Sequence, residues 1–189
     1  ADDRVIRRRI QKVLTNDSTN QEGVSAAAYW KAVLSLFKTR SDPDGPFPSN
    51  ALNYGYAVVR ACVARSLVAS GLHPALGIKH SNRGNAFVLA DDIMEPYRPF
   101  VGIHLIQKLL EWEQGDDLSP EMKREILNVL VVDSFWPEGR RPLLNSIQLS
   151  AASMAQVFAG DRDLPAFPSL CGKASTAPCG SVYFLTCPC

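Results

Sequence analysis

This sequence of 189 residues lacks any apolar run long enough to cross a membrane, and its opening residues contain no signal-peptide core. A membrane-spanning helix needs about 20 predominantly apolar residues, and a secretory signal needs a shorter apolar stretch behind a basic start. The first residue is Ala1 rather than Met, and a basic amphipathic segment follows it, so we expect the chain to begin inside a longer protein. We therefore expect a cytoplasmic protein with no membrane partner.

Cysteine is nearly absent from the first 170 residues, where Cys62 is the only one. Cys62 lies in an apolar helical pattern, in which a free thiol usually acts as a small buried hydrophobic group. The other cysteines all lie at the C-terminal end: Cys171, Cys179, Cys187 and Cys189. Their spacing lacks the closely paired cysteines of ordinary zinc sites. We therefore predict an atypical, unstructured or frame-shifted tail over residues 166–189, with zinc binding as the less favoured alternative.

The chain also lacks an excess of charge, since 20 Lys and Arg residues are balanced by 19 Asp and Glu residues. A formal net charge of +1 neither favours nor excludes nucleic-acid binding, because binding depends on where the charges lie. The basic residues cluster in three places: Arg7, Arg8, Arg9 and Lys12; Lys79 and Arg83; and Arg140 and Arg141. Each cluster alone is typical of a solvated surface, and only a neighbouring metal site would favour phosphate contact.

Alternating patterns typical of strands are scarce, whereas helical periodicity covers most of the chain. Pro96 and Pro99 predict a kink or a new helix start, and Gly71 and Gly160 are suited to end the helices before them. The predicted helices comprise residues 4–14, 22–37, 50–70, 86 to the first of these prolines, 100–112, 120–133 and 143–158. The sequence therefore predicts an all-α fold, with one helical domain over residues 1–165.

Two carboxylates, Asp92 and Glu95, lie three residues apart in an otherwise apolar stretch. On a helix this spacing places both on one face, as two oxygen ligands of a hard cation require. Unpaired carboxylates would be costly to bury there, and a divalent cation would compensate for that cost. A solvated helix face is the commoner origin of such an acidic cluster. A single histidine in a polar loop, such as His80, is also more often a surface residue than a ligand.

Two further segments are ambiguous when taken alone. Glu22, which follows Asn20 and Gln21, is suited to the first turn of a helix, where an acid interacts favourably with the helix dipole. Tyr56 and Arg60 lie four residues apart, so they would meet on one side of a helix. That pair is typical of a polar and aromatic face on a buried helix.

Together, and in this order, these segments resemble the first of the CRISPR-associated proteins, the spacer-acquisition integrase, and specifically its type II branch. The resemblance rests on N-x-E-G followed by AAAYW within residues 20–30, on NALNYGYAVVRACVARSLVASGLHPALGIKH at 50–80 and on NAFVLADDIMEPYRPF at 85–100. It covers most of residues 20–160, and its central block is too long and too particular to arise from composition.

The resemblance implies an all-helical catalytic domain that binds a divalent metal through Glu22, His80 and Glu95, with Asp92 as a candidate further ligand. A mixed nitrogen and oxygen ligand set suits Mg²⁺ or Mn²⁺ better than a structural zinc. Members of the family join a DNA fragment, the prespacer, into the CRISPR repeat, through attack of its 3′-hydroxyl on a phosphodiester. The basic residues beside these motifs then become candidate phosphate contacts: Arg60, Lys79 and Arg83.

The resemblance also implies partners and a missing domain. Members of the family carry an N-terminal β-rich domain that forms the homodimer and contacts a small partner, the second CRISPR-associated protein. Nothing in this sequence is similar to that domain, so we predict the C-terminal catalytic domain only.

Three functions compete for this sequence. They are a metal-dependent DNA endonuclease or integrase, a truncated non-catalytic remnant that binds DNA or a partner, and a purely structural helical module. The presence of Glu22, His80 and Glu95 favours the first over the third, whereas the missing dimerisation domain keeps the second open.

Overall fold

The structure, a computed structural model, describes residues 20, 21, 23–25, 27, 47–79, 82, 84–112 and 117–170. From residue 49 on, the elements are α3 (Ser49–Ala69), α4 (Val88–Met94), the 3₁₀ helix η3 (Glu95–Tyr97) and α5 (Arg98–Glu111). They are followed by α6 (Pro120–Leu127), η4 (Asn128–Val131), β1 (Asp133–Trp136), β2 (Gly139–Pro142) and α7 (Leu143–Ala159). Residues 21, 23–25 and 27 are also helical. A mostly helical domain is therefore confirmed.

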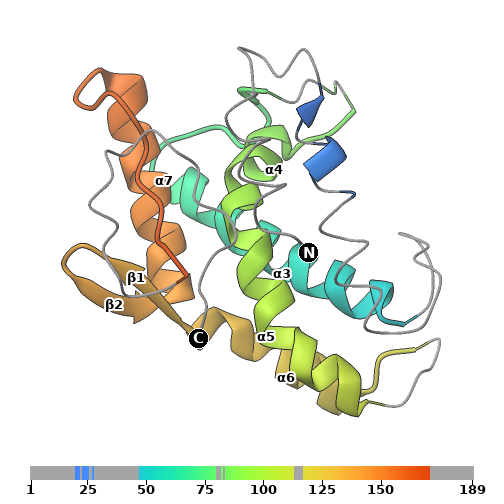
Figure 1. Cartoon of the computed structure of the whole chain (residues 1–189). Coiled ribbons are helices and arrows are strands. Elements are labelled where there is room, and N and C mark those ends of the chain that lie inside the picture. Colours follow the sequence, from blue (N-terminus) through green and yellow to red (C-terminus); the bar gives the residue numbers. More distant parts are fainter. Residues whose placement is uncertain are drawn as a thin grey trace.

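Helix α3 is the central element and contacts α4, α5, α6 and α7. Figure 1 shows α7 and the two strands on one side of it, with α4 and α6 toward opposite ends of the molecule. The buried face of α3 includes Ala51, Leu52, Tyr56, Val59, Val63 and Leu67. Gly55 lies on the same helix, and a Cβ atom there would come within 2.5 Å of Val101 Cγ1. Glycine therefore permits the close approach of α3 to α5.

The two prolines divide the next helical segment as predicted. Helix α4 ends at Met94, one 3₁₀ turn follows, and α5 begins at Arg98. Pro96 and Pro99 fall in the first turns of η3 and α5, where the missing N–H would have no helical acceptor. The predicted ends of two other helices are also confirmed, since Gly71, two residues after the end of α3, and Gly160, directly after α7, adopt φ values of +80° and +81°.

Helix η3 is fixed to α7 through a fully buried tyrosine. The hydroxyl of Tyr97 donates to Ser150 Oγ, at 2.6 Å, and to the backbone oxygen of Ser146, at 3.1 Å. These bonds satisfy the one polar atom of a side chain that the core otherwise surrounds with apolar groups. The position of η3, which begins with Glu95, is therefore tied to the far side of the core.

The helix predicted over residues 120–133 is shorter than expected. Helix α6 ends at Leu127 and η4 at Val131, and β1 then pairs with β2 as an antiparallel hairpin. The hairpin is held against α7, because Trp136 Nε1 donates to Ser146 Oγ at 2.6 Å and Ser134 Oγ lies 2.7 Å from the same oxygen. The sequence did not predict this hairpin, although the domain is mostly helical. The two strands of the hairpin have four residues each, and they gain their stability from pairing with each other and from packing on α7. A local sequence pattern does not reveal these contacts.

The packed domain extends to Leu170, beyond the predicted boundary at residue 165. Ala166 N donates to Ser153 Oγ at 2.9 Å, and Ser169 forms an antiparallel bridge with Phe135. The Phe167 ring meets the Tyr97 ring edge-on, with centroids 6.2 Å apart. The rest of the predicted tail, residues 171–189, lies outside the described residues.

Within the described ranges, we find no helix with both the length and the apolar character that a bilayer crossing demands.

Candidate functional site

The predicted site residues fall into two groups. Glu22, His80 and Arg83 lie outside the described residues, whereas Arg60, Lys79, Asp92 and Glu95 are described. Convergence of Glu22, His80 and Glu95 on one cation therefore stays a prediction. Across the part of the chain that the structure covers, no three His, Cys, Asp or Glu side chains are arranged to hold a metal. That result does not test the predicted site, because two of its three ligands are not in that part.

Glu95 is the first residue of η3, and its side chain is 36% exposed. Its Oε1 lies 3.0 Å from Nε of Arg98, an ion pair by distance in which Nε is not aligned as a hydrogen-bond donor. The Arg98 guanidinium also stacks over the ring of Tyr56, 4.9 Å from its centroid. The Glu95 carboxylate therefore has a cationic neighbour and stays accessible from solvent.

Arg98 is a functional candidate that the sequence reasoning missed. The available signal was its spacing from Glu95, since residues three apart on a helical turn are neighbours. Stacking on Tyr56 orients the guanidinium without using up its donors. Arg98 can therefore exchange its contact with Glu95 for a contact with a phosphate oxygen.

Asp92 is bound to the loop that precedes it. Its Oδ2 accepts hydrogen bonds from the backbone N–H groups of Ile78, at 2.6 Å, and Lys79, at 3.1 Å. Successive backbone N–H groups that converge on one point form a concave site for an anion. The carboxylate therefore joins α4 to the two residues immediately before His80.

Arg60 is engaged with protein groups rather than free on the surface. Its Nε lies 2.5 Å from Asp91 Oδ1, and its Nη2 lies 3.1 Å from Asp91 Oδ2, so the pair is bidentate. The Nη2 group also donates to Asn85 Oδ1 at 2.9 Å, and the guanidinium stacks 5.0 Å from the Phe87 centroid. Such planar, forked recognition is typical of a structural arginine. The predicted phosphate contact of Arg60 stays a prediction, whereas its link between α3 and α4 is observed.

The described residues of the loop between α3 and α4 are attached to α4 on both sides of His80. Besides the contacts of Asp92, Leu89 N donates to the backbone oxygen of Pro74 at 2.7 Å. Near the other end of the loop, Asn85 Nδ2 donates to Asp91 Oδ2 at 2.6 Å. The sequence reasoning missed Asn85 and Asp91, because their common partner Arg60 is 25 and 31 residues away. These contacts define the path of the loop on both sides of His80.

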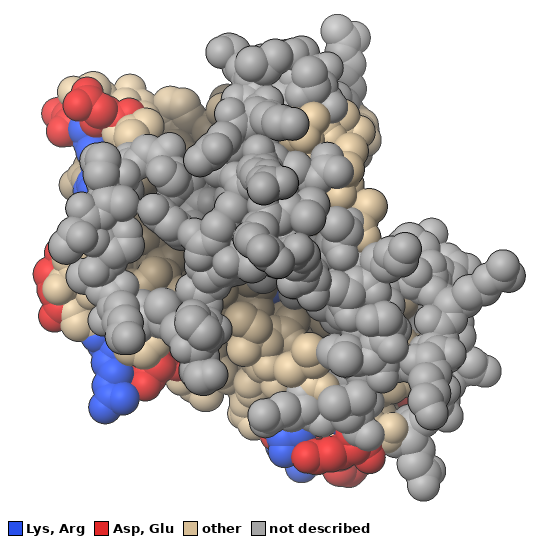
Figure 2. Space-filling view, viewed as in Figure 1, with Lys and Arg blue, Asp and Glu red and all other residues tan. Residues whose placement is uncertain are grey.

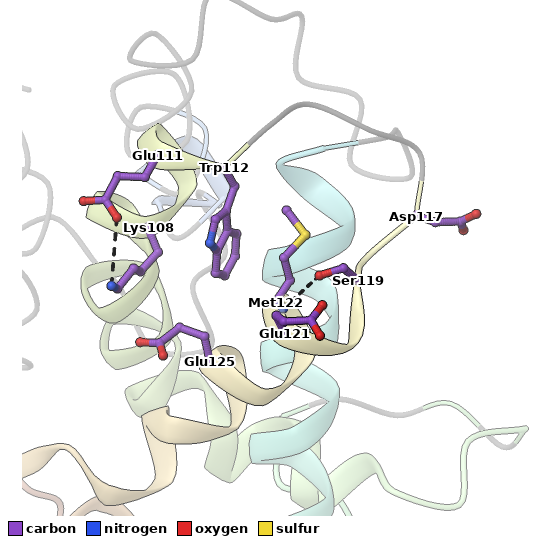
Figure 3. Close-up of a pocket in the computed structure, with 8 residues that line it drawn as sticks. All are labelled: Lys108, Glu111, Trp112, Asp117, Ser119, Glu121, Met122 and Glu125. Carbon is purple, nitrogen blue, oxygen red and sulfur yellow. Dashed lines mark hydrogen bonds and ion pairs between the residues drawn. The ribbon is translucent and has the colours of Figure 1, made fainter.

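A pocket of about 480 Å³ lies elsewhere, between the end of α5 and the start of α6. Figure 3 shows the Trp112 and Met122 side chains in the space between these helices. The pocket is lined by Lys108, Glu111, Trp112, Asp117, Ser119, Glu121, Met122 and Glu125. The pKa of the Glu121 carboxyl is lowered by hydrogen bonds to its own backbone and to Ser119. Half of this lining is acidic, so the pocket would repel a nucleic-acid phosphate, and no predicted site residue lines it.

Charges of opposite sign are interspersed on the visible surface. Figure 2 shows the described Lys and Arg side chains in small groups, each near Asp or Glu. Among the described residues, Arg140 pairs with Asp133, at 3.1 Å, and Lys108 with Glu111, at 3.9 Å. On this face, the described residues therefore present no extended basic surface.

Comparison with known proteins identifies related sequences. The family model of the CRISPR associated protein Cas1 matches residues 5–130. The CRISPR-associated endonuclease Cas1 of Neisseria meningitidis serogroup C is 38% identical over 119 residues, which cover 63% of this chain and 38% of that protein. A CRISPR-associated endonuclease Cas1 of Pyrobaculum aerophilum is 35% identical over 140 residues, covering 72% of this chain and 47% of its own. The chain thus spans less than half the length of these two relatives.

Among solved structures, a casposase bound to its integration product is similar, with a TM-score of 0.69 and 20% sequence identity. The match covers 80% of this chain and 52% of the casposase chain. At this identity the likeness establishes the fold alone.

Proposed function

The chain belongs to the Cas1 family of CRISPR-associated proteins, and on that premise we propose that it is a metal-dependent DNA endonuclease and integrase of CRISPR spacer acquisition. The observation that carries the proposal is the family match over residues 5–130, which includes Glu22, His80 and Glu95. The relatives are named endonucleases, and the casposase of similar fold is bound to an integration product. We assign the chain to the type II branch and to the catalytic domain.

The proposed cation is Mg²⁺ or Mn²⁺, with Glu22, His80 and Glu95 as its ligands. Glu95 fits this role, because its carboxylate is partly exposed and its ion-pair partner among the described residues, Arg98, is replaceable by another cation. Figure 1 shows the helical stretch that begins at residue 21 at the same end of the molecule as α4. The loop that leads to His80 is attached to α4 as well. Carboxylates with one imidazole are the donors that these cations accept.

The proposed reaction joins a prespacer 3′-hydroxyl to a phosphodiester of the repeat, with release of a 3′-oxygen. When bound, the divalent cation supplies Lewis-acid stabilisation of the phosphate and of the departing oxygen. Arg98, Lys79 and Arg83 would bind the phosphate oxygens and orient them for in-line attack. Arg60 would act indirectly, because its bonds to Asp91 and Asn85 support the start of α4.

The proposed macromolecular partners are the prespacer and repeat DNA, a second copy of the chain and the small second CRISPR-associated protein. Integration at two ends requires two active sites at a defined separation, so an assembly is expected for complete insertion. The alternative proposal is a non-catalytic remnant that binds DNA or a partner.

Strand transfer on branched DNA with Mn²⁺ tests the proposal and separates it from the alternative. We expect transfer by the unchanged chain, and a loss on the order of 10²–10³-fold in Glu95→Ala. Glu138→Ala is the matched control, because Glu138 is exposed in the hairpin turn. DNA binding should change less than about threefold in either variant, since phosphate contacts are spread over many basic groups. Binding without any transfer by the unchanged chain would support the remnant instead.

A further inference from the structure

The two adjacent carboxylates of α4 have different partners. Asp91 faces α3, where it is neutralised by Arg60 and also accepts from Asn85. Asp92 accepts from the backbone of the loop before α4. Successive residues on an α-helix diverge by about 100°, so the two side chains reach different neighbours. The contacts of Asp92 therefore need an explanation separate from those of Asp91.

We propose that Asp92 is a positioning residue, which fixes the backbone that leads into His80, rather than a ligand of the cation. This inference rests on the proposed metal site of Glu22, His80 and Glu95. Asp92 is three residues before Glu95 on one continuous helical segment, and its Oδ2 holds the N–H groups of Ile78 and Lys79. The carboxylate thus sets the distance between the element that carries Glu95 and the backbone one residue before His80.

The geometry at Oδ2 opposes a direct ligand role for this oxygen. Two N–H dipoles point their positive ends at it, at donor–acceptor distances of 2.6 and 3.1 Å. A cation bound at the same oxygen would face those hydrogens and would have to displace at least one of them. These two contacts require only a hydrogen-bond acceptor. A carboxylate is such an acceptor, and its negative charge strengthens both hydrogen bonds.

The loop also needs such a support. Ile78 is 59% exposed, and Lys79 is exposed as well, so little burial holds this stretch in place. Before Ile78 in the sequence, the backbone oxygen of Pro74 accepts a hydrogen bond from Leu89 N. After His80, the Asn85 side chain is hydrogen-bonded to Arg60 and Asp91. Among the contacts of the described residues given above, those of Asp92 lie closest in sequence to His80. Outer residues that orient a ligand in this way typically change metal affinity about 10–100-fold when removed.

The test is a double-mutant cycle on Mn²⁺ affinity, measured with the full chain by the electron paramagnetic resonance signal of free Mn²⁺. Asp92→Asn keeps an oxygen acceptor for both N–H groups, so its dissociation constant should stay within about threefold of that of the unchanged chain. Asp92→Ala should weaken binding by about 10–100-fold. In the His80→Ala background, Asp92→Ala should add less than about threefold, because it acts through His80. Glu138→Ala is the control for a lost carboxylate on the surface.

The outcomes are distinct. A loss in Asp92→Asn as large as in Asp92→Ala, or a full additional loss in the His80→Ala background, would overturn the inference and make Asp92 a ligand. Unchanged affinity in Asp92→Ala would also overturn it. If Asp92→Ala does not fold, the Asn variant in both backgrounds still decides between the two roles. Unchanged affinity in His80→Ala and Glu95→Ala would instead contradict the proposed metal site itself.

Discussion

The guanidinium of Arg60 and the carboxylate of Asp91 form a bidentate pair across 31 residues of sequence, with Nε 2.5 Å from Oδ1 and Nη2 3.1 Å from Oδ2. The pair joins the middle of α3 to the first turn of α4. Its side chains are 35% and 25% exposed, so solvent screens the interaction only in part. The stack on Phe87 adds a further restraint on the guanidinium.

Replacement of Arg60 by alanine should therefore destabilise the domain by about 1–3 kcal/mol, since it leaves a half-buried carboxylate with fewer donors. Arg140→Ala is the matched control, because Arg140 pairs with Asp133 in an exposed position, and such pairs contribute only about 0–1 kcal/mol. Urea unfolding of both variants measures the difference. Equal effects of the two substitutions would show that the Arg60 pair has no special role.

Tyr97→Phe should cost about 1–2 kcal/mol in unfolding free energy near pH 8, because Ser150 Oγ and the Ser146 carbonyl lose their donor. Tyr54→Phe is the control for a tyrosine at the edge of the core. Chemical denaturation followed by circular dichroism measures both. A stable Tyr97→Phe variant would show that the bonds between η3 and α7 are dispensable.

The stability contribution of Tyr97 should also depend on pH. Burial raises the pKa of the Tyr97 hydroxyl above its ordinary value, which is about 10 in an unfolded chain. The folded state therefore favours the protonated form, and its advantage is complete below pH 10 and falls as pH rises above it. The difference in unfolding free energy between the unchanged chain and Tyr97→Phe should shrink between pH 9 and pH 11. A constant difference over that range would contradict the assigned cause.

Gly55→Ala should destabilise the domain by about 1–3 kcal/mol, because the added Cβ would lie 2.5 Å from Val101 Cγ1. Val101→Ala removes that methyl group and leaves a cavity by itself. The double variant should therefore be more stable than the sum of the single effects predicts, by a margin that thermal unfolding can resolve. If the effects of the two substitutions on unfolding free energy simply added, Gly55 and Val101 would not be in direct contact.

A chain truncated after Leu170 should unfold at nearly the same temperature as the full chain, if residues 171–189 are dispensable as the sequence predicts. Truncation after Pro165 should instead cost about 2–4 kcal/mol, because it removes the partly buried Phe167 side chain and the bridge between Ser169 and Phe135. Thermal unfolding of both forms is the measurement. A large loss in the longer form would show that the cysteine-rich segment is structural.

Local signals in the sequence determined the helices that depend on them. Helix α6 begins at Pro120, as predicted, and Ser119 before it accepts from Met122 N at 3.2 Å. Helix α7 spans Leu143–Ala159, close to the predicted 143–158, because Gly160 supplies the left-handed residue that ends it. Such signals act within a few residues of the chain, so they are readable without a fold. The family was equally readable, since it rests on ordered motifs and not on packing.

Tertiary structure alone decided the partners of the polar groups. The spacing of Asp92 and Glu95 was visible in the sequence, but not that Asp92 holds the loop backbone or that Arg98 stacks on Tyr56. The hairpin was missed because Trp136 and Ser134 obtain their hydrogen-bond partner from Ser146, on the next helix. Residues far apart in sequence come into contact only when the whole core packs, and a single sequence does not show directly which of them will do so.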